Sequence, residues 1–212
     1  MSSDIRIPSA PITVNWTLTF RCNFSCMHCY SRVEDADELS TEDVKRIMDN
    51  VARYKVPFIN FGGGEPLLRK DLFELTAYAT SLGFNVSMNT NGFLMTKEKA
   101  RLAREAGFKT VGLSIDSDEP EVHDNFRKTP GSHARAAAAA KYLVDEGMRL
   151  TVSSVICRIN HHRFEELVRQ AKELGAEQIS LHNYKCTGLG MTNKDELDLT
   201  PEEWMRFYMK AL

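Results

Sequence analysis

Apolar and polar residues follow one another along this chain in two alternating rhythms. From residue 11 to residue 20 every second side chain is apolar from Ile12 onward, which is the period of a β-strand with one buried face. Residues 44, 47, 48 and 51 are also apolar, and this spacing places them on one side of an α-helix. The two rhythms recur to the end of the chain, so we predict a regular succession of strands and helices.

Six strands are predicted in this way. They cover residues 11–20, 58–61, 85–88, 110–115, 150–156 and 178–184. Helices are predicted after them, and the residues predicted to cap their N-termini are Ser40, Asp71, Thr96, Asn160 and Thr200. The interval after residue 116 is longer, and we interpret it as an acidic turn and a loop that lead into an alanine-rich helix over residues 134–146.

The alternation of strands and helices determines the expected fold class. Units of about 25–40 residues, each a strand followed by a helix, favour a parallel sheet with right-handed crossovers. One α/β domain over residues 1–212 is expected, either an open doubly wound sheet or a partial barrel. In both architectures ligands bind at the carboxyl ends of the strands.

Composition and charge narrow the expected partners and compartment. The chain is 42% hydrophobic and 26% charged with a net charge of −2, which gives no reason to expect nucleic acid or a membrane surface as a partner. No apolar run reaches the roughly 18 residues of a membrane span, and the first residues do not resemble a secretion signal. We therefore expect a cytoplasmic protein whose five cysteines are thiols or metal ligands and not disulfides.

Three of these cysteines, Cys22, Cys26 and Cys29, directly follow the first predicted strand. Their clustering argues against plain buried thiols, and their odd number argues against a disulfide loop. A structural zinc site needs four ligands, and His28, between the last two cysteines, cannot easily reach the same ion, although zinc remains an alternative. A [4Fe–4S] cluster normally takes four cysteines, so three of them predict a cluster with one iron open to a substrate or cofactor.

Two motifs resemble the radical S-adenosylmethionine superfamily. The first is C-x3-C-x2-C at the end of the first strand, with the aromatic His28 before its last cysteine. The second is Gly-Gly-Glu-Pro, residues 63–66, at the end of the next strand. The family folds as a (βα)6 partial TIM barrel with parallel strands, and the resemblance covers nearly the whole chain, so it favours the partial barrel over the open sheet.

The resemblance also implies a cofactor site. Cys22, Cys26 and Cys29 would ligate three irons of a [4Fe–4S] cluster, and the amino and carboxylate groups of S-adenosyl-L-methionine would chelate the fourth. The residues implied to hold that cofactor are Gly63, Gly64 and Glu65 at the methionine amino group, Thr90 and Ser114 at its carboxylate or the ribose, Asp116 in support, and His28 and Tyr30 beside the adenine. Glycine lets the backbone approach a ligand closely, and a carboxylate suits an ammonium group.

The expected function follows from the same resemblance. One electron breaks the bond from the sulfonium to the 5′ carbon, and the resulting 5′-deoxyadenosyl radical abstracts hydrogen from a substrate. The runs 113–116 and 187–190 look most like the branch that matures peptides, so a peptide or protein substrate is predicted. A radical enzyme of tetrapyrrole or other cofactor biosynthesis, acting on a small molecule, is an alternative, and a non-catalytic iron–sulfur or zinc module is an alternative of another class. An electron donor such as flavodoxin or ferredoxin is the implied partner.

Other motifs are given structural interpretations. Cys157 and Cys186 end neighbouring predicted strands and are interpreted as plain buried thiols. His123 is expected to hold the loop after Asp116 in place. Many proteins of this resemblance carry a cysteine-rich extension after the barrel, so we expect this chain to be the core domain alone, cut before such an extension.

Overall fold

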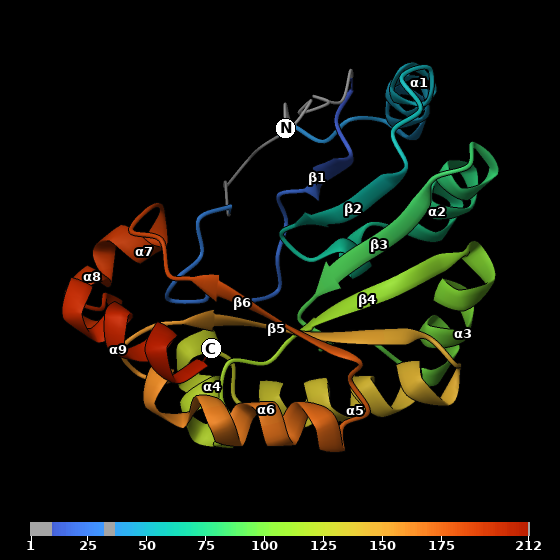
Figure 1. Ribbon diagram of the computed structural model, residues 1–212. Helices are drawn as coiled ribbons and strands as arrows, with labels where there is room; N and C mark the ends of the chain where they lie inside the picture. The colour runs from blue at the N-terminus through green and yellow to red at the C-terminus, as the bar shows by residue number, and fades with distance from the viewer. Residues whose placement is uncertain (1–9, 32–36, 212) are drawn as a thin grey trace, which may run out of the picture.

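The computed structural model describes residues 10–31 and 37–211 and contains one six-stranded sheet (Figure 1). All neighbouring strands are parallel, and they pair in chain order from β1 to β6. The strands are β1 (Thr13–Thr19), β2 (Phe58–Gly63), β3 (Asn85–Thr90), β4 (Phe108–Ser114), β5 (Arg149–Ile156) and β6 (Gln178–Asn183).

The helices lie mainly on the convex side of this curved sheet, and β1 and β6 form its two edges (Figure 1). The longer helices are α1 (Thr41–Ala52), α2 (Leu72–Ser81), α3 (Lys97–Ala106), α5 (Ser132–Asp145), α6 (Phe164–Glu173) and α9 (Pro201–Ala211). The shorter ones are α4 (Pro120–Arg127), α7 (Leu189–Thr192), α8 (Lys194–Leu197), and the 3-10 turns η1 (Pro66–Leu68) and η2 (His161–Arg163). The predicted partial (βα)6 barrel is therefore confirmed.

The main apolar core fills the space between the sheet and the helices. Ile59, Val86 and Val111 are fully buried in neighbouring strands, and Leu75 of α2 belongs to the same cluster. Because side chains alternate along a strand, the residues next to these face the concave side. Among them Asn60, Ser87 and Gly112 are polar or small, and only Phe58 at the start of β2 is large and apolar, so much of the concave surface is polar where a site can form.

Three predicted N-caps are confirmed. The hydroxyl of Ser40 accepts from Asp43 N at 3.1 Å, and that of Thr96 accepts from Lys99 N at 3.2 Å. Thr200 does the same for α9, where its backbone N–H also donates to the side chain of Glu203 at 2.8 Å. These reciprocal contacts make Thr200 and Glu203 a capping box.

Two other predicted N-caps are wrong. Asp71 precedes α2, but its carboxylate does not cap that helix and instead accepts from Arg69 Nε at 2.7 Å and from Thr41 Oγ1 at 2.7 Å. Asn160 precedes η2, and its side chain turns toward the sheet to bond the backbone of Asp116 and Val155, each at 2.8 Å. In both cases a longer-range partner outcompetes the local backbone.

Helix α4 occupies part of the interval that the sequence pattern predicts as turn and loop. Its buried face carries His123, Phe126 and Arg127. Because two of these three residues are polar, the sequence shows no apolar stripe that would predict a helix. The carboxylate of Asp124 then accepts from His133 N and Ser132 Oγ, both at 2.8 Å, which starts α5 two residues before its predicted position.

Two sequence predictions concern residues outside the described ranges. The acidic run over residues 33–39 also predicts a loop, and most of it lies there, as does Leu212, to which the sequence pattern extends the final helix. Within the described ranges, none of the helices combines the length and the apolar character that crossing a membrane would require.

Candidate functional site

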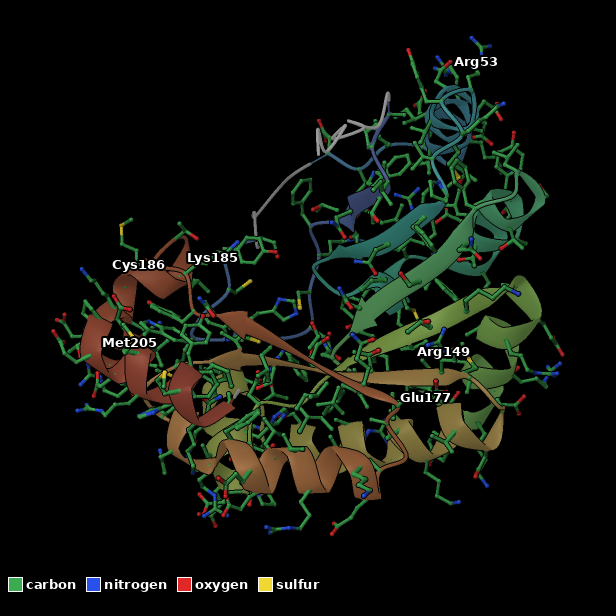
Figure 2. The ribbon with its side chains drawn as sticks, viewed as in Figure 1. Arg53, Arg149, Glu177, Lys185, Cys186 and Met205 are labelled. Atoms are coloured by element: carbon green, nitrogen blue, oxygen red, sulfur yellow. The ribbon has the colours of Figure 1, made fainter. Side chains whose placement is uncertain are left out.

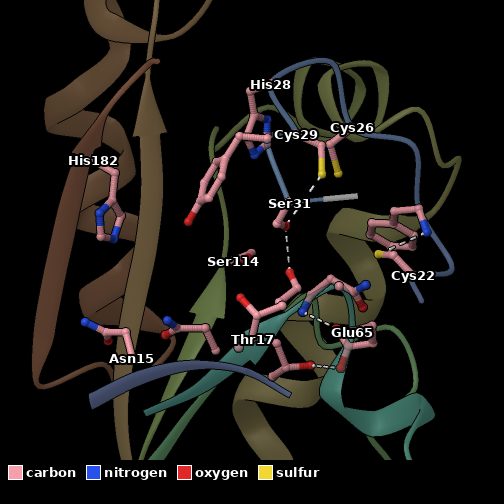
Figure 3. Close-up of a pocket in the computed structure, with 18 of the residues that line it drawn as sticks. Asn15, Thr17, Cys22, Cys26, His28, Cys29, Ser31, Glu65, Ser114 and His182 are labelled. Atoms are coloured by element: carbon pink, nitrogen blue, oxygen red, sulfur yellow. Dashed lines mark hydrogen bonds between the residues drawn. The ribbon is translucent and has the colours of Figure 1, made fainter. Parts of the chain in front are cut away.

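A cavity of about 430 Å³ opens at the carboxyl ends of the strands on the concave side (Figure 3). Its lining brings together ten of the eleven residues that the sequence assigns to the cofactor site. These ten are Cys22, Cys26, His28, Cys29, Tyr30, Gly63, Gly64, Glu65, Thr90 and Ser114. Asp116 is the exception, because it lies behind the lining.

The cysteines sit on a loop that follows β1 and packs against α4. Met27 N donates to Phe126 O at 3.0 Å, and Cys29 N donates to Cys26 O at 3.1 Å. Burial raises the pKa of the Cys26 thiol to about 11, although the nearby Arg127 charge acts in the opposite direction. Burial also raises the pKa of Cys22. Without a metal these two thiols hold their protons, so metal binding must release them.

The donor set fits a cluster with three protein ligands. The three sulfurs point into one hollow (Figure 3), beside a glycine run whose first member, Gly62, would meet nothing within 4 Å if it carried a Cβ. Within the described ranges, no three ligating side chains are placed to hold a single metal ion. Three thiols on one open cavity match the three protein ligands of an iron–sulfur cluster that leaves one position for another ligand.

The glycine run is fastened to the cysteine loop. Gly64 N donates to Thr19 O and Glu65 N donates to Arg21 O, both at 2.8 Å. A Cβ on Gly64 would lie 2.0 Å from Arg21 O, and Gly63 has a φ of +114°, which favours glycine. Close backbone approach therefore explains these glycines, and it makes the first two strand ends one unit.

Glu65 is the most heavily hydrogen-bonded side chain of the lining. Its Oε1 accepts from Thr90 Oγ1 at 2.6 Å and from Leu67 N at 3.1 Å, and its Oε2 accepts from Asn91 N at 2.8 Å. Burial raises the pKa of this carboxyl, and the three donors oppose that shift. A carboxylate has about four acceptor sites, so one site remains for a further donor in the cavity.

The end of β3 is joined to the cysteine loop through Asn91. Its side-chain amide donates to Asn23 Oδ1 at 2.9 Å, and its own Oδ1 accepts from Phe93 N at 2.9 Å. Thr90 is buried, and its hydroxyl donates to Glu65. The first three strand ends are thus cross-linked by side-chain hydrogen bonds.

Asp116 supports the site from behind through Arg127. Its Oδ2 accepts from Arg127 Nε at 2.6 Å, and its Oδ1 accepts from Val155 N at 2.9 Å. Burial opposes ionisation of this carboxyl, but the Arg127 charge holds its pKa below the ordinary value. Arg127 lines the cavity, and its Nη1 lies 4.0 Å from Cys26 Sγ.

His123 holds the segment after β4, as expected. Its Nδ1 accepts from Asp116 N at 3.2 Å, and burial lowers its pKa to about 4. A neutral imidazole is required for that acceptor role. The histidine therefore fixes the backbone of Asp116 while staying outside the cavity lining.

The two aromatic residues of the cysteine loop, His28 and Tyr30, lie in different environments. The His28 ring stacks on Phe126 with centroids 4.4 Å apart, and within the described chain its buried Nδ1 has no hydrogen-bond partner. Tyr30 lines the cavity but is 68% exposed. Ser31, which the sequence analysis missed, donates to Gly63 O at 2.9 Å and lies 3.9 Å from Cys29 Sγ.

The cavity has two ends that differ in character. We call the part around the sulfurs the cofactor end; it comprises Cys22, Cys26, Cys29, Glu65, Thr90 and Arg127. We call the polar residues that line the cavity away from the sulfurs the open end; they are Asn15, Thr17, Asn60, Asn89 and His182. Figure 3 shows His182 on β6 and Asn15 on β1, both away from the sulfurs.

The sequence places Asn89, one of these five residues, at the end of a predicted strand, where ligands are expected. It gives no prediction for the other four, although a signal was available. In β1 two polar residues of the alternating run, Asn15 and Thr17, line the cavity, and Trp16 between them also contributes to the lining. Arg127 was missed for another reason: the helix that presents it has a polar buried face and was not predicted.

The other two cysteines lie outside the cavity lining. Cys157 is fully buried against Met27, Tyr184 and Leu197, and burial raises its pKa to about 12. Cys186 is half-buried after β6 and packs on the same cluster. Figure 2 shows it at the opposite end of the last two strands from the Arg149–Glu177 ion pair, whose Nε and Oε2 atoms are 3.1 Å apart.

Comparison with known proteins places this geometry in a family. The model of the radical SAM superfamily matches residues 16–171. The AdoMet-dependent heme synthase of Methanosarcina barkeri is 34% identical over 95% of this chain and 58% of that protein. The mycofactocin maturase MftC of Mycolicibacterium smegmatis is 35% identical over 94% of this chain and 51% of that protein.

A solved structure shows the same fold. SuiB of Streptococcus suis bound to S-adenosylmethionine superposes with a TM-score of 0.76 at 21% identity, over 84% of this chain and 41% of that one. The chain spans about half the length of the curated relatives it matches. The family model covers most of the chain, and it includes the cysteine loop, the glycine run and the ends of β1 to β5. The chain therefore belongs to the radical SAM superfamily.

Proposed function

We propose that this chain is the core of an enzyme that cleaves S-adenosylmethionine reductively at a [4Fe–4S] cluster held by Cys22, Cys26 and Cys29. The observation that carries the proposal is the convergence of these three thiols, the glycine run and Glu65 on one cavity. When bound, the cluster and S-adenosylmethionine together supply a 5′-deoxyadenosyl radical that can abstract hydrogen from a substrate. The alternative of a non-catalytic metal module does not account for the glycine run and its carboxylate.

The residues of the chain position the cofactor and keep water from its reactive part. The carbonyl of Gly63 and the remaining acceptor site of Glu65 suit the methionine ammonium group. Ser114 lines the cavity from the end of β4, where it suits a carboxylate or a ribose hydroxyl. His28 lines the cavity and stacks on the buried Phe126, so its ring is held in place where it suits the adenine.

Among substrates, the open end favours a peptide. Its side chains are amides, a hydroxyl and an imidazole, which can donate to and accept from peptide groups. In the described part of the lining, the one permanently charged cation is Arg127, and Asp116 already pairs with it. A tetrapyrrole with several carboxylates would need further cations to compensate its desolvation. Peptide modification agrees with the names of MftC, a maturase, and of a SuiB structure bound to its precursor peptide SuiA.

The experiment is anaerobic incubation of the iron-loaded protein with dithionite and S-adenosylmethionine. We expect 5′-deoxyadenosine to form, with dithionite replacing the flavodoxin or ferredoxin that we propose as the natural electron donor. An intact cluster, seen as brown colour and absorbance near about 400 nm, that produces no 5′-deoxyadenosine would overturn the enzymatic proposal. Zinc in place of iron in protein purified anaerobically would support the module instead.

Substrate class is tested in the same assay. Short peptides encoded beside the gene are expected to increase the rate of 5′-deoxyadenosine formation and to change mass themselves. Iron coproporphyrin III is the matched tetrapyrrole probe, and it is expected to leave the rate unchanged. Stimulation by the tetrapyrrole and by none of the peptides would contradict the peptide proposal while leaving the cleavage reaction intact.

A further inference from the structure

Arg127 occupies an unusual position for a permanently charged side chain. It is only 7% exposed, at the end of α4 and behind the cysteine loop. Burying a guanidinium without compensation costs several kcal/mol, so its placement needs a reason. Its contacts divide between two partners: Nε donates to Asp116 Oδ2 at 2.6 Å, and Nη1 points to Cys26 Sγ at 4.0 Å.

Asp116 is held so firmly that it fixes the position of the arginine. Its second oxygen accepts from Val155 N at 2.9 Å, and its backbone N–H is fixed by His123. Its carbonyl accepts from Asn160 Nδ2 at 2.8 Å. Through its side chain and backbone, Asp116 is therefore anchored to β5, α4 and the turn before η2, and its carboxylate holds the guanidinium beside the sulfur of Cys26.

We propose that the Asp116–Arg127 pair sets the reduction potential of the cluster by placing a fixed cation beside the Cys26 sulfur. This inference rests on the proposed cluster but goes beyond cofactor binding. Reduction adds one electron, supplied by the external donor, and makes the cluster more negative. A nearby cation stabilises the more negative form, and hydrogen bonds to ligating sulfurs act in the same direction. Asp116 positions this cation and at the same time moderates its field.

The proposal predicts shifts of opposite sign from the two partners. Arg127→Gln removes the cation and should make the potential more negative. Asp116→Asn removes the anion and leaves the arginine uncompensated, so it should make the potential more positive. The second shift is expected to be the smaller one, because the carboxylate lies behind the guanidinium as seen from Cys26. A purely structural role would move both potentials in the same direction or leave both unchanged.

The test is a potentiometric titration of the iron-loaded protein, followed by electron paramagnetic resonance of the reduced cluster, without S-adenosylmethionine. For Arg127→Gln we expect at least a tenfold lower ratio of reduced to oxidised cluster at a fixed potential, or about 59 mV for one electron. Arg127→Lys keeps the charge and should recover most of the shift. Arg163→Gln breaks another arginine–aspartate pair, with Asp118, outside the cavity lining, and should leave the potential unchanged.

The outcomes separate this inference from the proposed function. A wild-type protein that binds no iron would overturn both. An intact cluster with unchanged potential in Arg127→Gln overturns this inference alone, and weaker binding of S-adenosylmethionine in that variant would then identify Arg127 as a cofactor contact. If Arg127→Gln fails to load iron, Asp116→Asn decides, because an unchanged or more negative potential there overturns the proposal.

Discussion

The cofactor end and the open end of the cavity are built by opposite means. At the cofactor end, Glu65, Thr90 and Arg127 are buried, and each is held by side-chain hydrogen bonds or an ion pair. At the open end, Asn15 and His182 are exposed. Asn15 makes one long contact there, in which its Oδ1 accepts from Asn60 Nδ2 at 3.3 Å.

The difference in burial and hydrogen bonding between the two ends indicates which side chains must be rigid. Groups that hold a cofactor must keep their geometry before the cofactor arrives, and buried, mutually satisfied hydrogen bonds supply that preorganisation. Groups that meet a substrate from solution must leave their donors and acceptors available. Within the cavity, the buried polar side chains thus lie at the cofactor end, and the polar side chains of the two edge strands are exposed to water.

The largest expected effect comes from the cofactor end. Cys26→Ala should remove the brown colour and all formation of 5′-deoxyadenosine, because two thiols remain where three irons need ligands. Cys157→Ala is the matched control, a buried cysteine outside the cavity, and it should keep both properties. Iron analysis and product detection by mass spectrometry measure the two variants. Cleavage retained by Cys26→Ala would refute its assignment as a ligand.

The next effect distinguishes two glycines of one run. Gly64→Ala places a methyl group 2.0 Å from Arg21 O, so it should lower the free energy of unfolding by about 3 kcal/mol and displace the cysteine loop. Gly62→Ala meets nothing within 4 Å and should preserve both stability and iron content. Chemical denaturation under anaerobic conditions and iron analysis compare them. Equal losses in both variants would mean that backbone approach is not what requires Gly64.

A pH dependence of similar size is expected from His123. Its pKa is lowered from 6.5 to about 4 by burial, so below pH 6.5 the unfolded chain binds a proton that the folded chain does not. Stability should therefore fall as the pH drops from about 6.5 to about 4, by about 3 kcal/mol from this residue.

The matched variant is His123→Gln, whose side chain still offers an acceptor to Asp116 N but does not titrate in this range. We expect its unfolding free energy to depend less steeply on pH than that of the wild type, with both measured by urea denaturation between pH 4.5 and pH 7.5. Identical pH slopes for the two proteins would contradict a neutral, buried imidazole at this position.

The smallest effect is expected at the open end. Asn15→Ala removes an exposed side chain, so the free energy of unfolding should change by no more than about 0.5 kcal/mol. Formation of 5′-deoxyadenosine without substrate should also stay the same. With a peptide substrate we expect a higher KM and an unchanged kcat. Loss of cleavage without substrate would erase the distinction between the two ends.

Much of the fold was predictable because its signals are local. Alternating apolar residues mark the strands, and Ser40 and Thr96 mark helix starts at which no distant group competes. Asp71 and Asn160 carry the same local signal, but Thr41 and the backbone of Asp116 form hydrogen bonds with their side chains. Sequence spacing does not reveal such long-range competition.

The site was predictable to the extent that its residues belong to short motifs. The three cysteines follow β1 and the glycine run ends β2, so each group forms one short motif, and the structure brings both motifs to one cavity. Arg127 reaches that cavity from α4, whose buried face is mostly polar, so the apolar spacing that predicts a helix is absent there. Ser31 is seen only when Gly63, two elements away in the chain, is placed next to it.

The most direct test of this account is pulsed electron paramagnetic resonance of the reduced, iron-loaded protein with S-adenosylmethionine that carries ¹⁵N in its amino group. The account predicts a magnetic coupling between that nitrogen and the cluster, because the cofactor occupies the iron that Cys22, Cys26 and Cys29 leave open. An intact reduced cluster whose spectrum shows no coupling to saturating S-adenosylmethionine would contradict it.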